Sequence, residues 1–495
     1  MSVANASAAG QRESLKEAEG LQEPPVNTQL VVRSERLTST EFLNLLRSVD
    51  ELHSSLIRLA PLGSLRFSST DSPISGMPVL LKDNIETRDM PTTAGSLALA
   101  GNAPGRDAPL VTRLRNAGAV ILGKTNLSEW ANIRSSESIS GWSAVGGQTR
   151  NPYDGERTPC GSSSGSAVAV AIGLAPAAVG TETDGSITCP ASVNGVVGFK
   201  PTVGLVSRTH VVPISHSQDT AGPITRTVED AAIVLSAIAG SDSADVATAE
   251  ADARKVDYRA ALDAGSLRGA RIGVMRFLLD GYSAETRAAF EQSLTALRAA
   301  GAQLVEITEA PADYQRIGGW ELTVLLTELK HDLNAYLAST DPAQVRTRTL
   351  ADVIAFNAAE PRETVLFGQD LFERAEKTSG LDDPAYVEAR SRSLKAAGED
   401  GVDRMMCDHR LVALIAPTTS RAWTNDPEDE DEMQGSASRL AAVAGYPHLT
   451  VPMGLDRGMP VGLSFIGGKW EDARILSLGY AYERVRPFTP RASYR

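Results

Sequence analysis

Residues 160–187 read CGSSSGSAVAVAIGLAPAAVGTETDGSI, and this stretch is the most informative about the fold. Within it, SGSAVAVAIGLA is built almost entirely of small residues, which predicts a helix whose backbone packs closely against its neighbours. The following PAAVGT predicts a short buried strand. Because a helix and a buried strand alternate here over a short distance, we expect a layered α/β/α core.

The same alternation continues on both sides of this stretch, from about residue 76 to residue 240. DAPLVTRLRNAG begins on Asp and stops on Gly, which predicts a helix, and it lies near the apolar runs PVLLK and AVILGK. Residues 245–400 are rich in Ala, Glu and Arg, and we expect them to be mostly helical, with RIGVM and QLVEI as strands. From about residue 411, buried strands are predicted in LVALIAPTT, AGYPHLTVPMG and GMPVGLSFIGG.

The N-terminal region has two parts. Residues 1–28 are polar and lack periodicity, so we expect a loose tail. Residues 37–60, LTSTEFLNLLRSVDELHSSLIRLA, predict one amphipathic helix with Thr38 and Glu41 as a capping box and apolar residues at helical spacing as far as Leu56. Since no convincing linker follows, residues 29–495 are expected to form a single domain.

Composition narrows the class of protein. Hydrophobic residues make up 42% and charged residues 22%, as in ordinary soluble globular proteins. The formal net charge of −13 argues against nucleic acid or an anionic membrane as the main partner. No apolar run approaches the roughly 18 residues of a membrane span, and the N-terminus has no apolar signal core. We therefore expect a cytoplasmic protein, or a mature form whose leader has been removed.

The cysteines and histidines form no recognisable framework. Cys160, Cys189 and Cys407 are too few for a disulfide framework, so nothing demands an oxidising compartment. The six histidines show no H-x-x-x-H spacing, and Cys407 with His409 lacks a second pair of ligands. We expect no metal site.

Two segments match short functional motifs but lack the neighbouring secondary structure that those motifs require. Residues 118–125, GAVILGKT, satisfy the P-loop expression, but a P-loop follows a strand and opens a helix, whereas Ala-Val-Ile-Leu is itself strand-forming. Residues 161–165, GSSSG, fit the nucleophile elbow of α/β-hydrolases, with Ser163 as nucleophile and a distant histidine as base. The elbow needs a strand directly before it, and the polar NPYDGERTPC stands there instead. The sequence does not exclude a histidine base, but a Gly/Ser-rich turn is the simpler interpretation.

Three further segments occur in a fixed order, each at a loop beside a predicted core strand. GMPVLLKDN contains Lys82, CGSSSGS contains Ser162, and GTETDGSI contains Ser186, which lies 24 positions after Ser162. Each segment alone has an ordinary interpretation as a strand end, a turn or a loop. Their joint occurrence favours a catalytic site.

On these segments the chain resembles the amidase-signature family, from about residue 37 to 485. GMPVLLKDNI is similar to the family's lysine segment, and family-like positions are also held by GKTNLSEW, GVVGFKPTVGLVSR, SQDTAGPITRTVEDAA, YPHLTVPMG and GYAYE. Within the family the chain is most similar to bacterial peptide amidases, which release ammonia from the C-terminal carboxamide of peptides. The resemblance implies an α/β/α fold with a large mixed central sheet covered by helices, and it implies no metal or organic cofactor.

The resemblance also assigns catalytic roles. It implies Ser186 as the nucleophile, Ser162 as a bridging serine next to a cis peptide bond, and Lys82 as the base. A serine hydroxyl is a weak nucleophile that needs a base within hydrogen-bond reach. Lysine can be that base only when it is neutral, a state that burial favours by lowering its pKa. The implied oxyanion hole consists of the backbone N–H groups of Thr183, Asp184, Gly185 and Ser186.

The chain departs from the family pattern around the nucleophile. Much of the family reads D-x-G-G-S-I-R there, whereas this chain has Glu182, Asp184 and Thr188 in place of the Asp, the first of the paired glycines and the Arg. The T-E-T-D-G-S-I version is similar to peptide amidases. Asp184 would narrow the pocket and place a carboxyl near the reacting carbonyl. Our hypothesis is that it disfavours substrates with a free carboxylate at that point, in agreement with a neutral terminal amide as substrate.

The expected function is hydrolysis of carboxamides, with the C-terminal amide of peptides or amino-acid amides as substrate and an acyl-enzyme on Ser186. Two alternatives stay open: a broader aryl-acylamide or carbamate hydrolase, and the ammonia-supplying amidase subunit of a transamidating complex. A catalytically dead scaffold is disfavoured because all three catalytic positions are intact. We expect no nucleic-acid or membrane partner, and the chain could be a monomer or a homo-oligomer. Candidate pocket residues, for each of which a core role is favoured, are Leu325, Leu326, Tyr336, Phe367 and Trp423.

Overall fold

The computed structural model describes residues 39–66, 70–425 and 434–489. The chain divides into two compact units, residues 1–45 and 46–495. Of the first unit, only residues 39–45 are described, and they begin helix α3 (Ser39–Asp50). The predicted tail and Thr38 of the predicted capping box lie outside the described residues.

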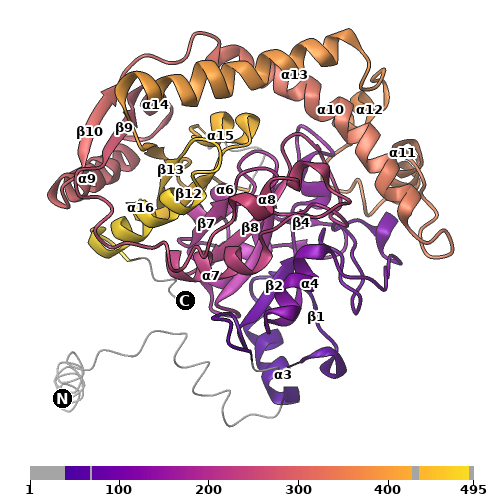
Figure 1. The fold of residues 1–495 in the computed structure, drawn as a ribbon. Helices are drawn as coiled ribbons and strands as arrows, with labels where there is room; N and C mark the ends of the chain where they lie inside the picture. Colours follow the sequence, from indigo (N-terminus) through magenta and orange to yellow (C-terminus); the bar gives the residue numbers. More distant parts are fainter. Residues whose placement is uncertain (1–38, 67–69, 426–433, 490–495) are drawn as a thin grey trace, which may run out of the picture. The chain divides into compact units, whose positions relative to one another are not determined.

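An 11-stranded mixed sheet forms the centre of the second unit, in the order β1-β3-β2-β6-β8-β7-β12-β13-β11-β9-β10 (Figure 1). The parallel pairs are β2 with β3 and β6, and β9 with β10 and β11, whereas the remaining pairs are antiparallel. The expected α/β class with a large mixed sheet is therefore confirmed. The strands of this sheet are β1 (Leu56–Leu59), β2 (Pro78–Lys82), β3 (Val120–Thr125), β6 (Ala177–Glu182), β7 (Val197–Lys200), β8 (Thr220–Thr225), β9 (Arg271–Met275), β10 (Gln303–Ile307), β11 (Ala413–Pro417), β12 (His448–Asp456) and β13 (Met459–Ile466). A separate two-stranded sheet pairs β4 (Trp142–Ser143) with β5 (Gly147–Gln148).

Helices cover both faces of the large sheet. Alternate residues of β12 point to opposite faces, as in any strand. Leu449 packs against α16 at Gly479, whereas Thr450 faces Ser192 of α6 across Gly462. The α-helices after α3 are α4 (Pro109–Asn116), α5 (Ser164–Ala171), α6 (Thr188–Val193), α7 (Val228–Ile238), α8 (Ala251–Arg254), α9 (Ala284–Ala299), α10 (Tyr314–Ser339), α11 (Leu350–Ala359), α12 (Asp370–Glu376), α13 (Pro384–Ala397), α14 (Arg404–His409), α15 (Ser438–Ala444) and α16 (Asp472–Val485).

Shorter helical turns connect these elements. They are η1 (Leu62–Ser64), η2 (Leu97–Leu99), η3 (Glu129–Asn132), η4 (Val246–Thr248) and η5 (Arg276–Gly281), and a π-helical segment, η6 (Gly398–Asp403), joins α13 to α14. None of the described helices has both the length and the apolar character needed to cross a bilayer. The long helix α10 packs against α12 and α13, and these helices appear in salmon and orange in Figure 1.

The stretch quoted first folds as predicted, with helix α5 leading into strand β6. Every residue of α5 is buried, and its backbone runs close to neighbouring backbone. A Cβ atom placed on Gly165 would lie 2.3 Å from the carbonyl oxygen of Ser55 and 2.6 Å from that of Asn126. Only glycine fits at this position, which explains the small-residue composition.

The prediction of one helix over residues 37–60 is wrong beyond Asp50. The Asp50 carboxylate accepts hydrogen bonds from the backbone N–H groups of Ser55 and Leu56, and Ser54 adopts a positive φ of 49°. These contacts end the helix and turn the chain. Leu56, which has helical spacing in the sequence, lies instead in β1, paired antiparallel with β3.

The sequence indicates no disulfide framework, but two of the three cysteines are bonded to each other. Cys160 and Cys189, 29 positions apart, form a disulfide with a Cα–Cα distance of 6.0 Å. The bond joins the residue before the serine-rich turn to helix α6. Two isolated cysteines carry no spacing signal in the sequence, and only the turn between β6 and α6 brings them together. Cys407 is a free, exposed thiol.

Candidate active site

Lys82 is the last residue of β2, an interior strand of the large sheet between β3 and β6, and its side chain is completely buried. Its Nζ lies 2.7 Å from the Oγ of Ser162 and 2.9 Å from the Oγ1 of Thr181. Burial lowers the pKa of Lys82 to about 7, although the nearby charges of Asp219 and Glu182 act in the opposite direction. Close to neutral pH, a substantial fraction of this amine is therefore uncharged.

The serine-rich turn joins Lys82 to the β6–α6 segment. The peptide bond between Gly161 and Ser162 is cis, as the family resemblance implies at this position. Next to it, Ser163 donates from its Oγ to the carbonyl oxygen of Thr181 at 3.0 Å and accepts the N–H of Thr181 at 3.2 Å. The N–H of Ser163 donates to the carbonyl oxygen of Ser186 at 3.1 Å.

These contacts bear on the elbow motif. Residues 151–160 contain no helix and no regular strand, so the strand that an α/β-hydrolase elbow needs is missing at this point of the described chain. The hydroxyl of Ser163 forms hydrogen bonds with the backbone of β6 as both donor and acceptor. GSSSG therefore acts as a turn that opens α5 and positions Ser162.

Ser186 lies in a tight turn between β6 and α6, and it is 9% exposed. The buried carboxylate of Glu182 accepts the N–H groups of Ile187 at 2.7 Å and Thr188 at 2.9 Å, and Gly185 has a positive φ of 81°. None of the N–H groups of residues 183–186 donates to a backbone carbonyl of the described residues. Glu182 thus fixes a turn whose donors are available for another acceptor.

Two other buried lysines stand near this site, and their contacts distinguish them from Lys82. Lys124, within GAVILGKT, lies in strand β3, so this segment is strand as predicted, and its amine forms an ion pair of 2.9 Å with Asp83. Burial lowers the pKa of Lys200 to about 8, while its amine donates to the carbonyl oxygen of Pro201. Of the three, Lys82 is the one bonded to a serine hydroxyl.

A second acidic group faces Asp184. Glu321, on α10, is 5% exposed, and its carboxylate accepts the side-chain amide of Gln218 at 2.9 Å. Burial, together with the neighbouring charge of Asp184, raises the pKa of Glu321 well above its usual range. The neutral form of Glu321 is therefore favoured beside the turn that contains Ser186.

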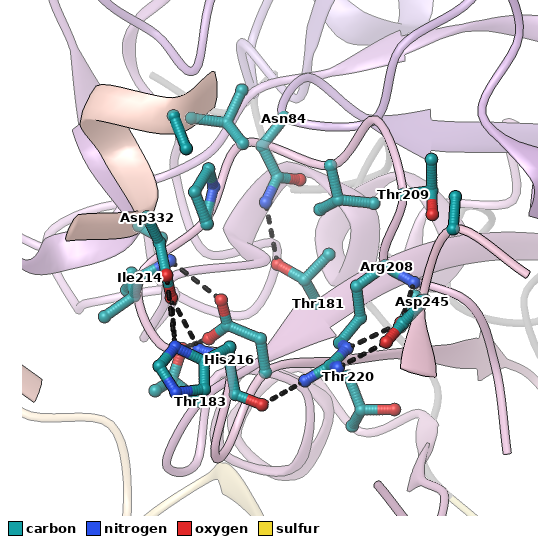
Figure 2. A pocket seen from close by; sticks show the side chains of 18 residues that line it. Asn84, Thr181, Thr183, Arg208, Thr209, Ile214, His216, Thr220, Asp245 and Asp332 are labelled. Atoms are coloured by element: carbon teal, nitrogen blue, oxygen red, sulfur yellow. Dashed lines mark hydrogen bonds and ion pairs between the residues drawn. The ribbon is translucent and has the colours of Figure 1, made fainter. Parts of the chain in front are cut away.

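A cavity of about 330 Å³ lies on the Thr181 side of Lys82. Figure 2 shows His216 and Asp332 at one side of it, Arg208 and Asp245 at the other, and Thr181 between them. The residues lining it are Asn84, Ala131, Thr181, Thr183, Arg208, Thr209, Val211, Val212, Pro213, Ile214, His216, Asp219, Thr220, Ala221, Ala244, Asp245, Asp332 and Ala335.

Asp219 connects this cavity to the turn that contains Ser186. Its carboxylate accepts the hydroxyl of Thr183 at 2.6 Å and the N–H groups of Ile214 and Ser215. Burial is the main reason that the pKa of Asp219 is raised to about 6. Its charge also favours the protonated form of Lys82.

The candidate pocket residues do not line this cavity. Leu326 and Tyr336 belong to the core around α10, with the Tyr336 hydroxyl 2.9 Å from Glu86, and Leu325 packs against that core. Phe367 stacks edge-on with Trp142, and Trp423 packs against the cluster that contains the disulfide. The favoured core interpretation agrees with these contacts.

Several residues near the site carry no separate prediction from the sequence. Thr181, Gln218 and Asp219 lie within the family-like segments GTETDGSI and SQDTAGPITRTVEDAA. The sequence therefore indicates that these segments belong to the family pattern, but it does not indicate which contacts the three residues make. Glu321 lies in a helix with no motif. Only the packing of α10 brings it to Asp184.

Comparison with known proteins agrees with this geometry. The Amidase family model matches residues 53–476. A probable amidase of Arabidopsis thaliana is 40% identical over 428 residues, which cover 84% of this chain and 78% of that protein. A glutamyl-tRNA(Gln) amidotransferase subunit of Roseiflexus castenholzii is 37% identical, covering 85% of this chain and 84% of that protein.

Solved structures give the same result. The native peptide amidase from Stenotrophomonas maltophilia is 48% identical, with a TM-score of 0.85 over 95% of this chain and 99% of that one. The match of the family model over most of the sequence and the shared fold lead to one conclusion: the chain belongs to the amidase family, whose members hydrolyse amide bonds.

Proposed function

We propose that the protein is a serine amidase that hydrolyses the C-terminal carboxamide of peptides or amino-acid amides through an acyl-enzyme on Ser186. The observation that carries this proposal is the contact of 2.7 Å between the Nζ of Lys82 and the Oγ of Ser162 in a buried site. The likeness to a peptide amidase structure at 48% identity supports the choice of substrate.

In this proposal Lys82 is the base. Its pKa of about 7 provides neutral amine near neutral pH, and Ser162 passes the proton of the Ser186 hydroxyl to it. The Ser186 oxygen then attacks the amide carbonyl, and the resulting oxyanion is stabilised by N–H groups of residues 183–186. Donors of this kind each contribute about 3–4 kcal/mol.

The second half of the cycle returns the proton. Collapse of the tetrahedral intermediate breaks the C–N bond, and the proton held by Lys82 moves through Ser162 to the leaving nitrogen, which departs as ammonia. Water attacks the acyl-enzyme with the same base, and the products are a free carboxylic acid and regenerated Ser186. No step needs an oxidant, a reductant or a metal.

The environment of Asp184 supports a neutral substrate. Asp184, in the turn that contains Ser186, lies next to the buried Glu321, whose pKa is raised by burial and by the charge of Asp184. A carboxylate on the substrate at this position would meet the charge of Asp184, whereas a carboxamide would not. Burial favours the neutral form of Glu321, which is the form that can donate a hydrogen bond to a carbonyl group.

The test is ammonia release from a dipeptide amide, an amino-acid amide, free glutamine and an anilide, each with the wild-type protein and with Ser186→Ala. The proposal expects release from the dipeptide amide that the substitution abolishes. Turnover of the anilide alone would be compatible with the same catalytic residues, but it would favour the broader aryl-acylamide or carbamate hydrolase over the peptide amidase. Activity that survives Ser186→Ala would reject the site.

One observation favours a second candidate. Glutamyl-tRNA(Gln) amidotransferase subunits of two bacteria, Roseiflexus castenholzii and Acidothermus cellulolyticus, are similar over more than four fifths of this chain. An ammonia-supplying role would need glutaminase activity and a stable heteromeric partner. Free glutamine in the substrate panel and size-exclusion chromatography of the complex isolated from its source would detect both.

A further inference from the structure

Two histidines and an aspartate converge at the open side of the cavity described above. His216 comes from the loop between β7 and β8, and His331 and Asp332 come from α10. The Oδ1 of Asp332 lies 3.1 Å from the Nδ1 of His216 and 2.8 Å from the Nδ1 of His331. Figure 2 shows His216 and Asp332 pointing toward each other at the cavity wall.

This arrangement has the dimensions of a metal site. One ligand atom from each of the three residues lies within 4.8 Å of the others. Around a tetrahedral zinc ion with bonds of about 2.0–2.1 Å, neighbouring ligand atoms stand about 3.3–3.4 Å apart. The two separations from Asp332 are somewhat shorter than this value, and the imidazole nitrogens lie within 4.8 Å of each other, so side-chain rotations would be needed to seat the ion. Both imidazoles are partly exposed, with side-chain exposures of 43% for His216 and 56% for His331, so an ion can reach them.

The surroundings hold the ligands in place. The second oxygen of Asp332 accepts the backbone N–H of His216 at 2.8 Å, which fixes the loop to the helix. The other ring nitrogen of His216, Nε2, lies 3.4 Å from the buried carboxylate of Glu328. A carboxylate behind a ligating histidine fixes the ring orientation and raises its basicity, and such outer partners typically accompany metal-bound histidines.

We propose that His216, His331 and Asp332 bind a divalent ion of the zinc type, with water in the remaining coordination position. Two imidazoles and one carboxylate suit zinc and related transition ions better than magnesium or calcium, which prefer oxygen ligands. The ion would clamp residues 213–219 onto α10 at the edge of the cavity. This site is separate from the amide-hydrolysing residues, and the reaction proceeds without it.

The sequence gives no spacing signal for such a site. His216 and Asp332 are 116 positions apart and come from two elements, so the linear patterns of metal motifs do not apply. Cys407 and His409, which the sequence places side by side, provide matched controls. Both are exposed, and both lie in α14, away from these residues in the sequence.

The test uses full-length protein without a histidine tag, treated with EDTA and dialysed. Zinc chloride is titrated by calorimetry into the wild type, His331→Ala, Asp332→Asn, His409→Ala and Cys407→Ser. The proposal expects one zinc ion per chain, affinity at least about 10-fold weaker in His331→Ala and Asp332→Asn, and unchanged affinity in the two controls. It also expects zinc to raise the melting temperature of the wild type and not that of His331→Ala.

Two further measurements keep the proposal open to rejection. X-ray absorption of the zinc-loaded protein is expected to show nitrogen and oxygen ligands and no sulfur. Because His331 is exposed, His331→Ala is expected to melt at the wild-type temperature without zinc and to keep wild-type amidase activity. Equal zinc affinity in His331→Ala and the wild type, or binding lost in Cys407→Ser, would overturn the assignment.

Discussion

The amine of Lys82 and the hydroxyl of Ser162 are 2.7 Å apart, although 80 positions separate the two residues in the chain. Lys82 ends strand β2, and Ser162 precedes helix α5, which packs on the neighbouring strand β6. The contact is therefore made by the order of strands in the sheet. In the proposed mechanism this contact supplies a base for a serine nucleophile without a histidine.

Replacement of Lys82 by arginine tests this contact. Arginine retains the positive charge but does not deprotonate in a protein, so it cannot act as a base. We expect kcat/KM for a dipeptide amide to fall by about 10³-fold or more, as for the loss of other members of a catalytic unit. Steady-state ammonia release measures the loss, and circular dichroism checks the fold. A variant that keeps a tenth of the activity would refute a base at position 82.

Ser163→Ala distinguishes the two serine motifs. This change removes the hydroxyl that bonds both the N–H and the carbonyl of Thr181, so we expect a stability loss of about 1–3 kcal/mol. The variant is still expected to react with a fluorophosphonate probe, whose fluoride is displaced by the serine oxygen, and intact-mass spectrometry would detect the phosphonylated enzyme. Loss of all labelling in folded Ser163→Ala, with labelling retained in Ser186→Ala, would favour the α/β-hydrolase elbow.

The pH dependence follows from the direction of the Lys82 shift. Protonated Lys82 cannot accept a proton, so kcat/KM is expected to rise with pH and to level off above an inflection near 7. The charge of Asp219 raises the pKa of Lys82, and Asp219→Asn removes that charge. The acid limb of the profile is therefore expected to move to lower pH in this variant. An inflection that stays in place or moves upward would contradict this coupling.

Asp184→Gly tests the proposed selection against carboxylates. A contact between two like charges that lie close together costs several kcal/mol. Removing the Asp184 side chain eliminates such a contact with a substrate carboxylate. We expect the ratio of kcat/KM for free glutamine to that for a dipeptide amide to increase about tenfold or more. Glu321→Gln is the matched control, because burial favours the neutral form of Glu321 and glutamine is a neutral hydrogen-bonding group of similar size, so the ratio is expected to stay unchanged. Unchanged ratios in Asp184→Gly would remove the hypothesis.

The disulfide between Cys160 and Cys189 closes a loop of 29 positions. In the chain-entropy model, a loop of this length contributes about 3–4 kcal/mol. The double variant Cys160→Ala with Cys189→Ala is therefore expected to unfold at lower urea concentration than the wild type. Dithiothreitol should lower the wild-type midpoint and leave the double variant unchanged, while Cys407→Ser serves as the control for thiol effects.

The local elements of the fold could be predicted from the sequence alone. Hydrophobic runs bounded by turn residues predicted β2, β3, β6 and the C-terminal strands, and the small residues of 164–171 predicted a closely packed helix. These signals are local, because periodicity and glycine content act within a few residues of the chain. The resemblance of short segments supplied the family and the candidate positions Lys82, Ser162 and Ser186.

Tertiary packing decides which of these elements contact each other. It ended the first helix at Asp50 and placed Leu56 in β1, because pairing with β3 outweighs the helical spacing of one apolar residue. It also joined Cys160 to Cys189 and Glu321 to the surroundings of Asp184. Such contacts depend on strand order and helix packing across tens to hundreds of positions. No short stretch of sequence encodes them, since the free energy that selects them comes from burial in the complete core.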